Sequence, residues 1–408
     1  MYPDLSYILH DLFGTPVDNA FSVIQTFGLF LTLAVVVSGY VLYLEFRRYE
    51  KEGIFEGIKE KEVVGKGPEL MPILLSALLG FVLGFKILYV VNNFAEFKVD
   101  AAGVVLSTTG SWIGGVLGLL ILGSWRFYEL HKDKLIEPKT IEKIVMPHER
   151  VPDITIVAAI SGIIGSRLFS ILENMEDFLK DPIGQLISGS GLTIYGGLIL
   201  AFIVVYFYVK KRGIKPIYMM DAVAPSLIIG YAVGRLGCQF SGDGDWGIVN
   251  ELAKPGWFIL PDWAWAYDYP HNVINSMNTD PVTGNTFYGG EQIPDCGGLV
   301  AAGGQIPEHC TRLVKAVFPT PLYEAVLASI IFIILWVIRK RVKIIGMLFF
   351  IYLIFNGIER FFIEAIRVNE HYNILGVNWS MSQFIGLGLF FIGIAGVLYL
   401  RKFGVRRE

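Results

Sequence analysis

The stretch DAVAPSLIIGYAVGRLGCQFSGDGDWG, residues 221–247, joins an apolar run to a polar end. Its first thirteen residues are typical of a membrane helix, whereas the next fourteen contain an arginine, a cysteine, two aspartates and five glycines. An arginine in the middle of a bilayer costs at least about 2.5–3.5 kcal/mol on insertion scales, so it usually faces a protein interior or an aqueous cavity. The stretch therefore predicts a membrane-spanning helix that ends beside a polar site.

The composition indicates an all-α polytopic membrane protein. Of the 408 residues, 53% are hydrophobic and only 17% are charged, whereas soluble globular chains carry about 25% charged residues. Apolar runs long enough to cross the hydrocarbon core recur along the chain, and a β-barrel would show short alternating segments instead. We expect about nine transmembrane helices, near residues 21–45, 70–91, 104–125, 152–172, 192–209, 216–236, 321–338, 344–363 and 381–400.

The distribution of basic residues predicts the orientation. Most of the 34 Lys and Arg residues lie in alternate connecting segments, at 45–67, 126–150, 209–215, 339–343 and 401–408. By the positive-inside rule these segments are cytoplasmic, which places the N-terminus outside and the C-terminus in the cytoplasm, as an odd number of spans requires. The first twenty residues contain three aspartates and neither Lys nor Arg, so we expect no cleavable signal peptide.

Two apolar hairpins are similar in sequence, since residues 77–97 align with 159–178 and residues 110–122 with 192–204. The matching positions are Gly84 and Gly165, Lys86 and Arg167, Asn93 and Asn174, and Phe97 and Phe178. We interpret this as the parallel duplication of a helix pair, with chance similarity between two apolar hairpins as the alternative. Internal repeats are common in transporters, so the duplication alone favours that class.

A long loop at 237–320 is rich in Gly, Pro, Asp and aromatic residues and poor in Lys and Arg. Loops of this length are usually functional, so we expect an outer cap. Cys296 and Cys310 lie in it, and in an oxidising compartment they could pair. The sequence leaves a disulfide and two free thiols equally open.

Four basic residues remain inside the expected spans: Lys86, Arg167, Arg235 and Arg360. Snorkelling to the interface is the alternative to a functional role, and for Lys86 it is favoured. Arg235 and Arg360 lie near the outer ends of their helices, where the positive-inside rule disfavours them. Acidic or basic residues accompany both arginines, namely Asp243, Asp245, Glu359, Glu364 and Arg367. Two arginines at one depth indicate a shared anion, because a guanidinium fits a phosphate with two parallel donors.

Five stretches, in order along the chain, resemble the prolipoprotein diacylglyceryl transferase family. They are GIIGSRLFSIL (162–172), YGGLILA (195–201), DAVAPSLIIGYAVGRLG (221–237) with the acidic glycine-rich stretch after it, FPTPLYEA (318–325) and RFFIEAIRVNEHYNILGVNWSMSQ (360–383). The family transfers a diacylglyceryl group from phosphatidylglycerol to the lipobox cysteine of a preprolipoprotein, at the outer face of the bacterial inner membrane. The resemblance implies that activity here, with no cofactor, no metal and no nucleic acid as a partner.

The resemblance also implies roles for particular residues. Catalytic roles fall on Arg235, Arg360, Tyr195 and Asp243. Binding of phosphatidylglycerol falls on Arg235, Arg360, Arg167, Gly247, Glu364 and Arg367. The expected partners are phosphatidylglycerol, membrane lipids and the signal peptide of a preprolipoprotein with its lipobox cysteine, and the site is expected to open toward the periplasm.

This organisation divides the chain into a periplasmic N-terminal segment (1–20), a first span with a cytoplasmic loop (21–69), an extra helix pair (70–150), transferase-like core spans (151–236), a periplasmic cap loop (237–320) and transferase-like C-terminal spans (321–408). The extra pair adds two spans to the family's usual seven, and we expect it to be peripheral to the chemistry.

The chain departs from the family pattern at three positions. Tyr195 stands where the family usually has a histidine, Cys238 where it has an asparagine, and Phe27 where it has a tyrosine. These departures affect proton transfer, because tyrosine, with a pKa near ~10, is a poor base. For Cys238 we favour a small buried residue over a nucleophile. A lipid or anion transporter and an inactive lipid-binding homologue remain the alternative functions.

Overall fold

The computed structural model describes residues 1–64, 66–94, 97, 104, 107, 109–136, 138–182, 193–274, 278–279, 286–287, 291–369, 371–374 and 376–406. The chain forms two compact units. Unit 1 contains Met1–Arg48 and Ile214–Glu408, and unit 2 contains Tyr49–Gly213.

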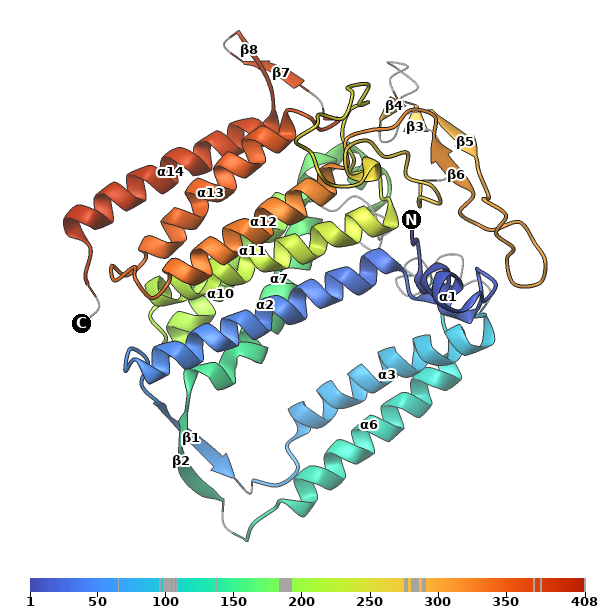
Figure 1. The fold of residues 1–408 in the computed structure, drawn as a ribbon. Helices are drawn as coiled ribbons and strands as arrows, with labels where there is room; N and C mark the ends of the chain where they lie inside the picture. The colour runs from blue at the N-terminus through green and yellow to red at the C-terminus, as the bar shows by residue number, and fades with distance from the viewer. Residues whose placement is uncertain are drawn as a thin grey trace. The chain divides into compact units, whose positions relative to one another are not determined.

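Helices dominate the described residues (Figure 1). Unit 1 contains α1 (Leu5–Phe13), most of α2 (Thr26–Lys51), α11 (Pro216–Ser241), α12 (Thr320–Ile338), α13 (Met347–Glu364) and α14 (Met381–Phe403). Unit 2 contains α3 (Leu70–Asn92), α6 (Trp112–Lys132), α7 (Val151–Glu173), α8 (Met175–Lys180) and α10 (Ile194–Lys211). The strands form two-stranded antiparallel sheets: β1 (Ile58–Val64) with β2 (Lys139–Val145), β3 (Asn278–Thr279) with β4 (Thr286–Phe287), β5 (Gln292–Pro294) with β6 (Thr311–Leu313), and β7 (His371–Ile374) with β8 (Val377–Ser380).

Seven of the described helices are long and apolar enough to cross a membrane, which confirms a helical polytopic membrane protein. These are α2, α3, α6, α7 with the short turn before it, α11, α12 and α14. Neither α10 nor α13 is among the seven; α13 carries Glu359, Arg360 and Glu364 within 18 residues. The expected total of nine spans and the orientation of the chain therefore stay predictions.

Three of the helix boundaries that differ from those expected have a clear local cause. The first apolar helix begins at Thr26, because Ala20–Val23 form a separate 3₁₀ turn. The helix expected at 104–125 begins at Trp112, where the Ser111 side chain caps it by accepting a hydrogen bond from the Gly114 amide. The helix expected to end at 236 continues to Ser241 and stops at Gly242, whose φ of 66° favours glycine. Arg235 thus lies inside α11 rather than at its end.

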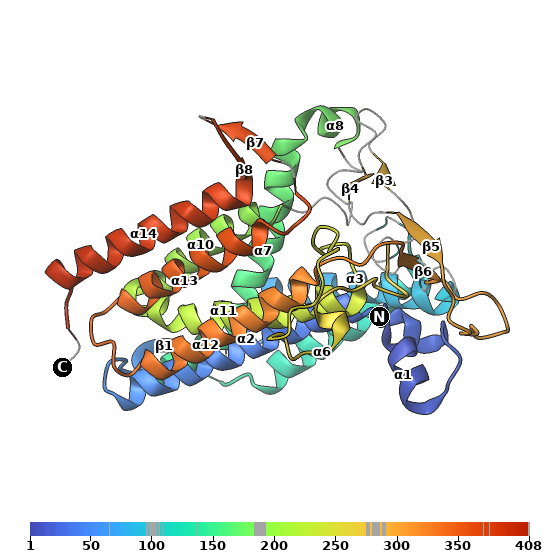
Figure 2. The same cartoon turned by 45° about the horizontal axis from the view of Figure 1, so that its top comes forward.

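In unit 1, α11 and α13 are joined by hydrogen bonds near the residues where both helices begin. The Asp221 carboxylate on α11 accepts hydrogen bonds from the amides of Gly346 (2.8 Å) and Phe349 (3.2 Å), which are otherwise free at the start of α13. Between the helices, Ile228, Ala328, Leu335 and other apolar residues form a buried core. The two helices therefore run in the same direction, and their later residues reach the same level. α14 packs along α13, as Figures 1 and 2 show.

Unit 2 contains two helix pairs, α3 with α6 and α7 with α10, that make corresponding contacts (Figure 1). The Ser111 amide donates to the Phe85 carbonyl in the first pair (2.9 Å), and the Thr193 amide donates to the Ser166 carbonyl in the second (3.2 Å). Gly84 faces the Gly114 backbone, and Gly165 faces the Gly196 backbone, too closely for a Cβ atom in either case. These contacts pair the same positions as the sequence alignment and support the proposed duplication.

The loop between α11 and α12 folds around a small core of Trp246, Tyr269, Leu313 and Val317. A disulfide joins Cys296 to Cys310, the two cysteines whose state the sequence left open. The N-terminal segment packs on this loop, since the amide of Ala302 donates to the carbonyl of Val17 at 2.8 Å.

Candidate functional site

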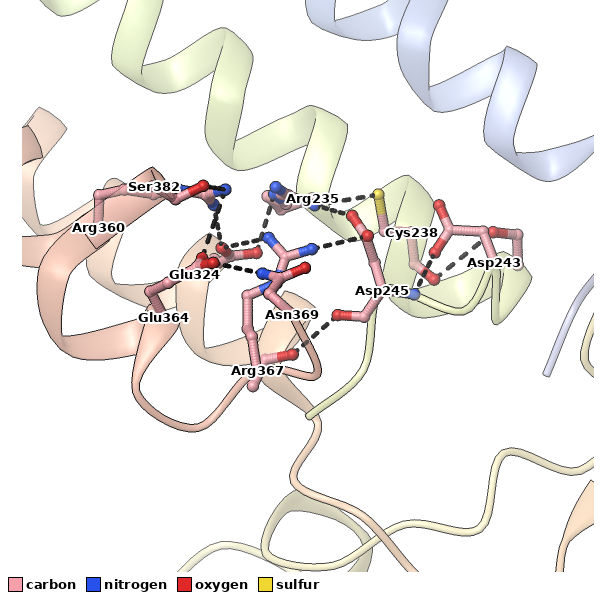
Figure 3. Close-up of polar contacts among 12 residues, drawn as sticks. Arg235, Cys238, Asp243, Asp245, Glu324, Arg360, Glu364, Arg367, Asn369 and Ser382 are labelled. Carbon is pink, nitrogen blue, oxygen red and sulfur yellow. Dashed lines mark hydrogen bonds and ion pairs between the residues drawn. The ribbon is translucent and has the colours of Figure 1, made fainter. Parts of the chain in front are cut away.

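Three helices of unit 1 each bring one charged side chain to a shared point (Figure 3). Glu324 on α12 is fully buried. Its Oε2 lies 2.9 Å from Nε of Arg235 on α11, and its Oε1 lies 3.0 Å from Nη1 of Arg360 on α13. The two arginines that the sequence singled out are therefore bridged by one carboxylate.

Arg367, which follows α13, closes a second bridge. Its Nη1 lies 3.4 Å from Oε1 of Glu324, and its Nη2 lies 2.7 Å from Oδ1 of Asp245. Asp245 also forms an ion pair with Arg235. Although burial acts to raise it, the charges of Arg367 and Arg235 hold the pKa of Asp245 below its usual range.

Glu364, at the end of α13, holds the far side of Arg360. The carboxylate lies 3.5 Å from Nη2 of Arg360, and it accepts hydrogen bonds from Ser380 (2.9 Å) and Asn369. Ser382, at the start of α14, accepts a further bond from Arg360 at 3.3 Å. We call Arg235, Asp245, Glu324, Arg360, Glu364 and Arg367 the arginine cluster.

The arginine cluster pairs its three arginines with three carboxylates, so its formal charge is balanced. Two donors remain available, since Nη2 of Arg235 and Nε of Arg360 have no hydrogen-bond partner in the part of the chain that the structure describes. Arg360 is also the most accessible of the three arginines, with 21% of its side chain exposed. Cationic donors that are fixed in place by buried carboxylates can bind an anion without reorganising.

Asp243 lies beside the cluster rather than in it. Its Oδ1 accepts a hydrogen bond from the Asp245 amide at 3.2 Å, and burial, together with the charge of Asp245, raises the pKa of Asp243. Cys238 is buried near Asp243, and its sulfur lies 3.7 Å from Nη1 of Arg235. The burial of Cys238 is consistent with the expectation of a small buried residue at this position.

Gly247 contributes backbone to the site. Its amide donates to the Phe318 carbonyl at 2.8 Å, and it forms a β-bridge with Arg367. A Cβ atom at this position would lie 2.8 Å from Cγ2 of Thr320 and 2.9 Å from Cβ of Phe318, so only glycine fits without a shift. This close approach connects the glycine-rich stretch after α11 to the segment that carries Arg367.

The remaining predicted residues belong to unit 2. Arg167 lies on α7 and Tyr195 on α10, whereas the arginine cluster is made entirely of unit 1 residues. Lys86 on α3 donates hydrogen bonds to the carbonyls of Val104 (2.8 Å), Ser107 (2.5 Å) and Thr109 (2.9 Å) of its own hairpin. Lys86 is therefore bound within its hairpin, and its extension to the membrane interface stays a prediction.

Glu324 is the member of the cluster that sequence reasoning missed. It stands in the FPTPLYEA stretch used for the family resemblance, and it is an acidic residue near the start of an apolar helix. That signal could have identified it, because an ionisable residue within an apolar helix usually faces a partner or a functional site.

Comparison with known proteins gives a consistent result. The model of the family described as "Prolipoprotein diacylglyceryl transferase" matches residues 131–399. A relative named phosphatidylglycerol–prolipoprotein diacylglyceryl transferase from Corynebacterium diphtheriae is 31% identical over 258 residues, which cover 62% of this chain and 78% of the relative. A relative of the same name from Bacillus cereus is 26% identical over 296 residues, which cover 72% of this chain and 88% of the relative.

Proposed function

The chain belongs to the prolipoprotein diacylglyceryl transferase family, and we propose that it transfers the diacylglyceryl group of phosphatidylglycerol to the thiol of a lipobox cysteine. The observation that carries the proposal is the arginine cluster, in which Arg235 and Arg360 from two helices share the buried carboxylate of Glu324. This reaction is the first step in the maturation of a preprolipoprotein. The substrates are a membrane lipid and a signal peptide.

Arg235 and Arg360 bind the phosphate of phosphatidylglycerol in this proposal. Each guanidinium keeps one N–H donor without a partner among the residues that the structure describes. Planar donors of this kind match phosphate oxygens better than an ammonium does. Glu324 holds the two side chains at a fixed separation, so binding the phosphate requires little ordering. Arg367 and Glu364 hold the outer parts of the same network and act as positioning residues.

The chemistry is a displacement at the glyceryl carbon that carries the phosphate. The cysteine thiolate attacks this carbon, its bond to the phosphate oxygen breaks, and glycerol phosphate leaves with the bonding electrons. Negative charge grows on the leaving phosphate, and the arginines stabilise it where it develops. The protein therefore needs no group that binds covalently to the lipid.

The other predicted residues take supporting roles. Asp243 and Gly247 shape the glycine-rich stretch that carries Asp245 to the cluster. A catalytic role for Tyr195 and lipid binding by Arg167 rest on the family resemblance alone, and both are retained in the proposal. The N-terminus and the cluster lie on the periplasmic side of a bacterial inner membrane, because the basic connecting segments lie at the opposite ends of the helices.

The test uses purified protein in vesicles with phosphatidylglycerol that carries isotopically heavy acyl chains. A lipobox peptide is added, and its mass is followed over time. We expect the peptide to gain one heavy diacylglyceryl group, and a peptide with serine in place of the cysteine to gain nothing. Wild-type protein that transfers nothing would contradict the proposal; specific binding of phosphatidylglycerol in that case would identify an inactive homologue.

A further inference from the structure

Glu359 is a buried carboxylate beside the arginine cluster, and none of the contacts within the cluster involves it. It precedes Arg360 on α13, only 4% of the residue is exposed, and neither carboxylate oxygen has a hydrogen-bond partner among the described residues. Burying an acid without a partner is costly, and native proteins rarely retain such a group without a reason. Glu359 therefore requires an explanation that packing does not provide.

Tyr231 on α11 is a second polar group of this kind. Its hydroxyl is also buried without a partner in the described part of the chain, and the Arg235 guanidinium lies over its ring, 5.3 Å from the centroid. Glu359 is within electrostatic range of Tyr231, and also of Glu324 and Arg360. Two unpartnered groups from two helices thus border the cluster, as expected where a substrate brings polar atoms of its own.

The titratable groups around Glu359 lie on three helices. Tyr231 and Arg235 lie on α11, Glu324 lies on α12, and Tyr352 lies on α13 itself. The neighbouring cations are the cluster arginines. Any change in the protonation of Glu359 is therefore coupled to the charge that binds the phosphate.

The proposed reaction needs a proton acceptor, because the nucleophile is the thiolate and a free cysteine has a pKa of about 8.5. The cluster carboxylates are poorly suited to this role. Glu324 contacts three arginines, Asp245 contacts two, and Glu364 contacts Arg360, Asn369 and Ser380. A proton on any of these carboxylates would break an ion pair that orders the arginines. Glu359 has no such direct contact.

The direction of attack also favours Glu359. In a displacement at carbon, the nucleophile approaches from the side opposite the leaving group, and the arginines mark the side of the leaving phosphate. Tyr231 precedes Arg235 by four residues, about 6 Å along a helix, and helical side chains lean toward the N-terminal end. Since α11 and α13 run in parallel, Tyr231 and Glu359 both stand on the inner side of their arginines in sequence, Tyr231 by four residues and Glu359 by one. That is the side on which the diacylglyceryl carbon lies when its phosphate is held by the arginines.

We propose that Glu359 is the base that accepts the proton of the lipobox thiol, an inference that rests on the proposed function. The S–H bond breaks as the proton moves to a Glu359 oxygen, and the sulfur forms a bond to the glyceryl carbon. The carbon–oxygen bond to the phosphate breaks, and its electrons leave with glycerol phosphate. The proton then passes from Glu359 to the departing phosphate or to water, which restores the carboxylate.

The test compares Glu359→Gln with wild type on two lipobox peptides, one with cysteine and one with selenocysteine. A selenol is already ionised at neutral pH, so its transfer does not need a base. With the cysteine peptide, Glu359→Gln should lose about 10²–10⁴-fold in rate, the usual contribution of a general base. Its residual rate should rise with pH up to about 8.5, where the thiol ionises without help.

The selenocysteine peptide separates a lost base from a damaged site. It should restore Glu359→Gln to within a few-fold of wild type, and it should not restore Arg235→Ala, which lacks the phosphate contact. Equal loss on both peptides, or near wild-type rates with cysteine, would overturn the assignment. Asp243→Asn that is rescued by selenocysteine while Glu359→Gln is not would give the role to Asp243. If Glu359→Gln does not insert into the membrane, Glu359→Asp is used, and it should retain the pH dependence of wild type.

These outcomes are distinct from failure of the proposed function. If wild-type protein transfers lipid to neither peptide, the transferase proposal itself is wrong. If wild type is active, only the comparison between the two peptides decides the role of Glu359.

Discussion

Glu324 lies 3.0 Å from Arg360, and this ion pair joins α12 to α13 at a fully buried carboxylate. The same carboxylate contacts Arg235 and Arg367, so one acidic side chain orders the three arginines. A substrate phosphate would meet donors that are already placed. The two arginines proposed to bind the phosphate therefore depend on a residue that itself need not touch the substrate.

Replacing Glu324 by Gln should destabilise the protein and reduce transfer strongly. Breaking a buried ion pair by removing one partner costs about 3–5 kcal/mol, because the remaining charges stay buried. Thermal unfolding in detergent and the transfer assay measure the two effects. Glu251→Gln is the control, since its pair with Lys315 is exposed and surface pairs contribute only about 0–1 kcal/mol. Similar behaviour of the two variants would contradict the role of Glu324.

The sequence predicted the helices and the two arginines for clear physical reasons. Long apolar runs specify membrane helices, and arginines near the outer ends of such runs require an anion or a buried partner. It did not decide between Asp243 and Asp245 as the partner of Arg235. That choice depends on the turn through Gly242 and Gly244, whose φ values of 66° and 93° direct the chain so that Asp245 points at the arginines.

The contacts of Glu324 were beyond sequence reasoning for a different reason. Its partners Arg235 and Arg360 lie on other helices, and only the packing of α11, α12 and α13 brings them together. The role of Lys86 was likewise hidden, because its acceptors are backbone carbonyls, which every residue carries. A sequence pattern identifies charged groups at unusual depths but not the neutral groups that satisfy them.

The tight contact between α7 and α10 predicts a difference between two glycines on the same helix. A Cβ atom on Gly165 would lie 2.6 Å from Cβ of Leu200, whereas one on Gly162 would meet nothing closer than 4.0 Å. Gly165→Ala should therefore destabilise the protein by about 1–3 kcal/mol, and Gly162→Ala should be neutral or stabilising by up to about 1 kcal/mol. Unfolding in a denaturing detergent measures both, and equal effects would exclude close packing at Gly165.

Lys86→Ala should leave transfer within a few-fold of wild type. Lys86 binds carbonyls of its own hairpin, and the family match begins at residue 131, after α3 and most of α6. The variant should lower thermal stability, since three backbone carbonyls, two of them partly buried, lose their donor. Loss of transfer comparable to that of Arg235→Ala in a folded variant would place this hairpin in the active site.

The N-terminal segment should detach from the long loop in acid. His271 and His309 lie close to Tyr7, and burial lowers the pKa of both histidines. The unfolded chain then binds more protons than the folded one below the usual histidine pKa of about 6.5. This contribution to stability is therefore complete above that pH and is lost as the pH falls from it through the lowered pKa values of the folded state.

Limited proteolysis of the loop at pH 7.5 and 5.5 measures this effect. Asp4 acts in the opposite direction, because burial raises its pKa to about 6 and its protonation in acid favours the folded state. The comparison is therefore made in protein that carries Asp4→Asn. In that background, His309→Gln should reduce the difference between the two pH values. An unchanged difference would show that these histidines do not control the contact.

The most direct test of the central claim, that Arg235 and Arg360 hold the lipid phosphate, is the rate of transfer from labelled phosphatidylglycerol by four single variants beside wild type. Replacing either arginine by Ala should reduce the rate by ~10²-fold or more, while the protein still inserts and purifies. Replacing either by Lys should restore little, because an ammonium is a point charge where the phosphate uses a planar pair of donors. If the Lys variants were nearly as active as wild type, or the Ala variants retained full activity, the arginine cluster would not be the phosphate site.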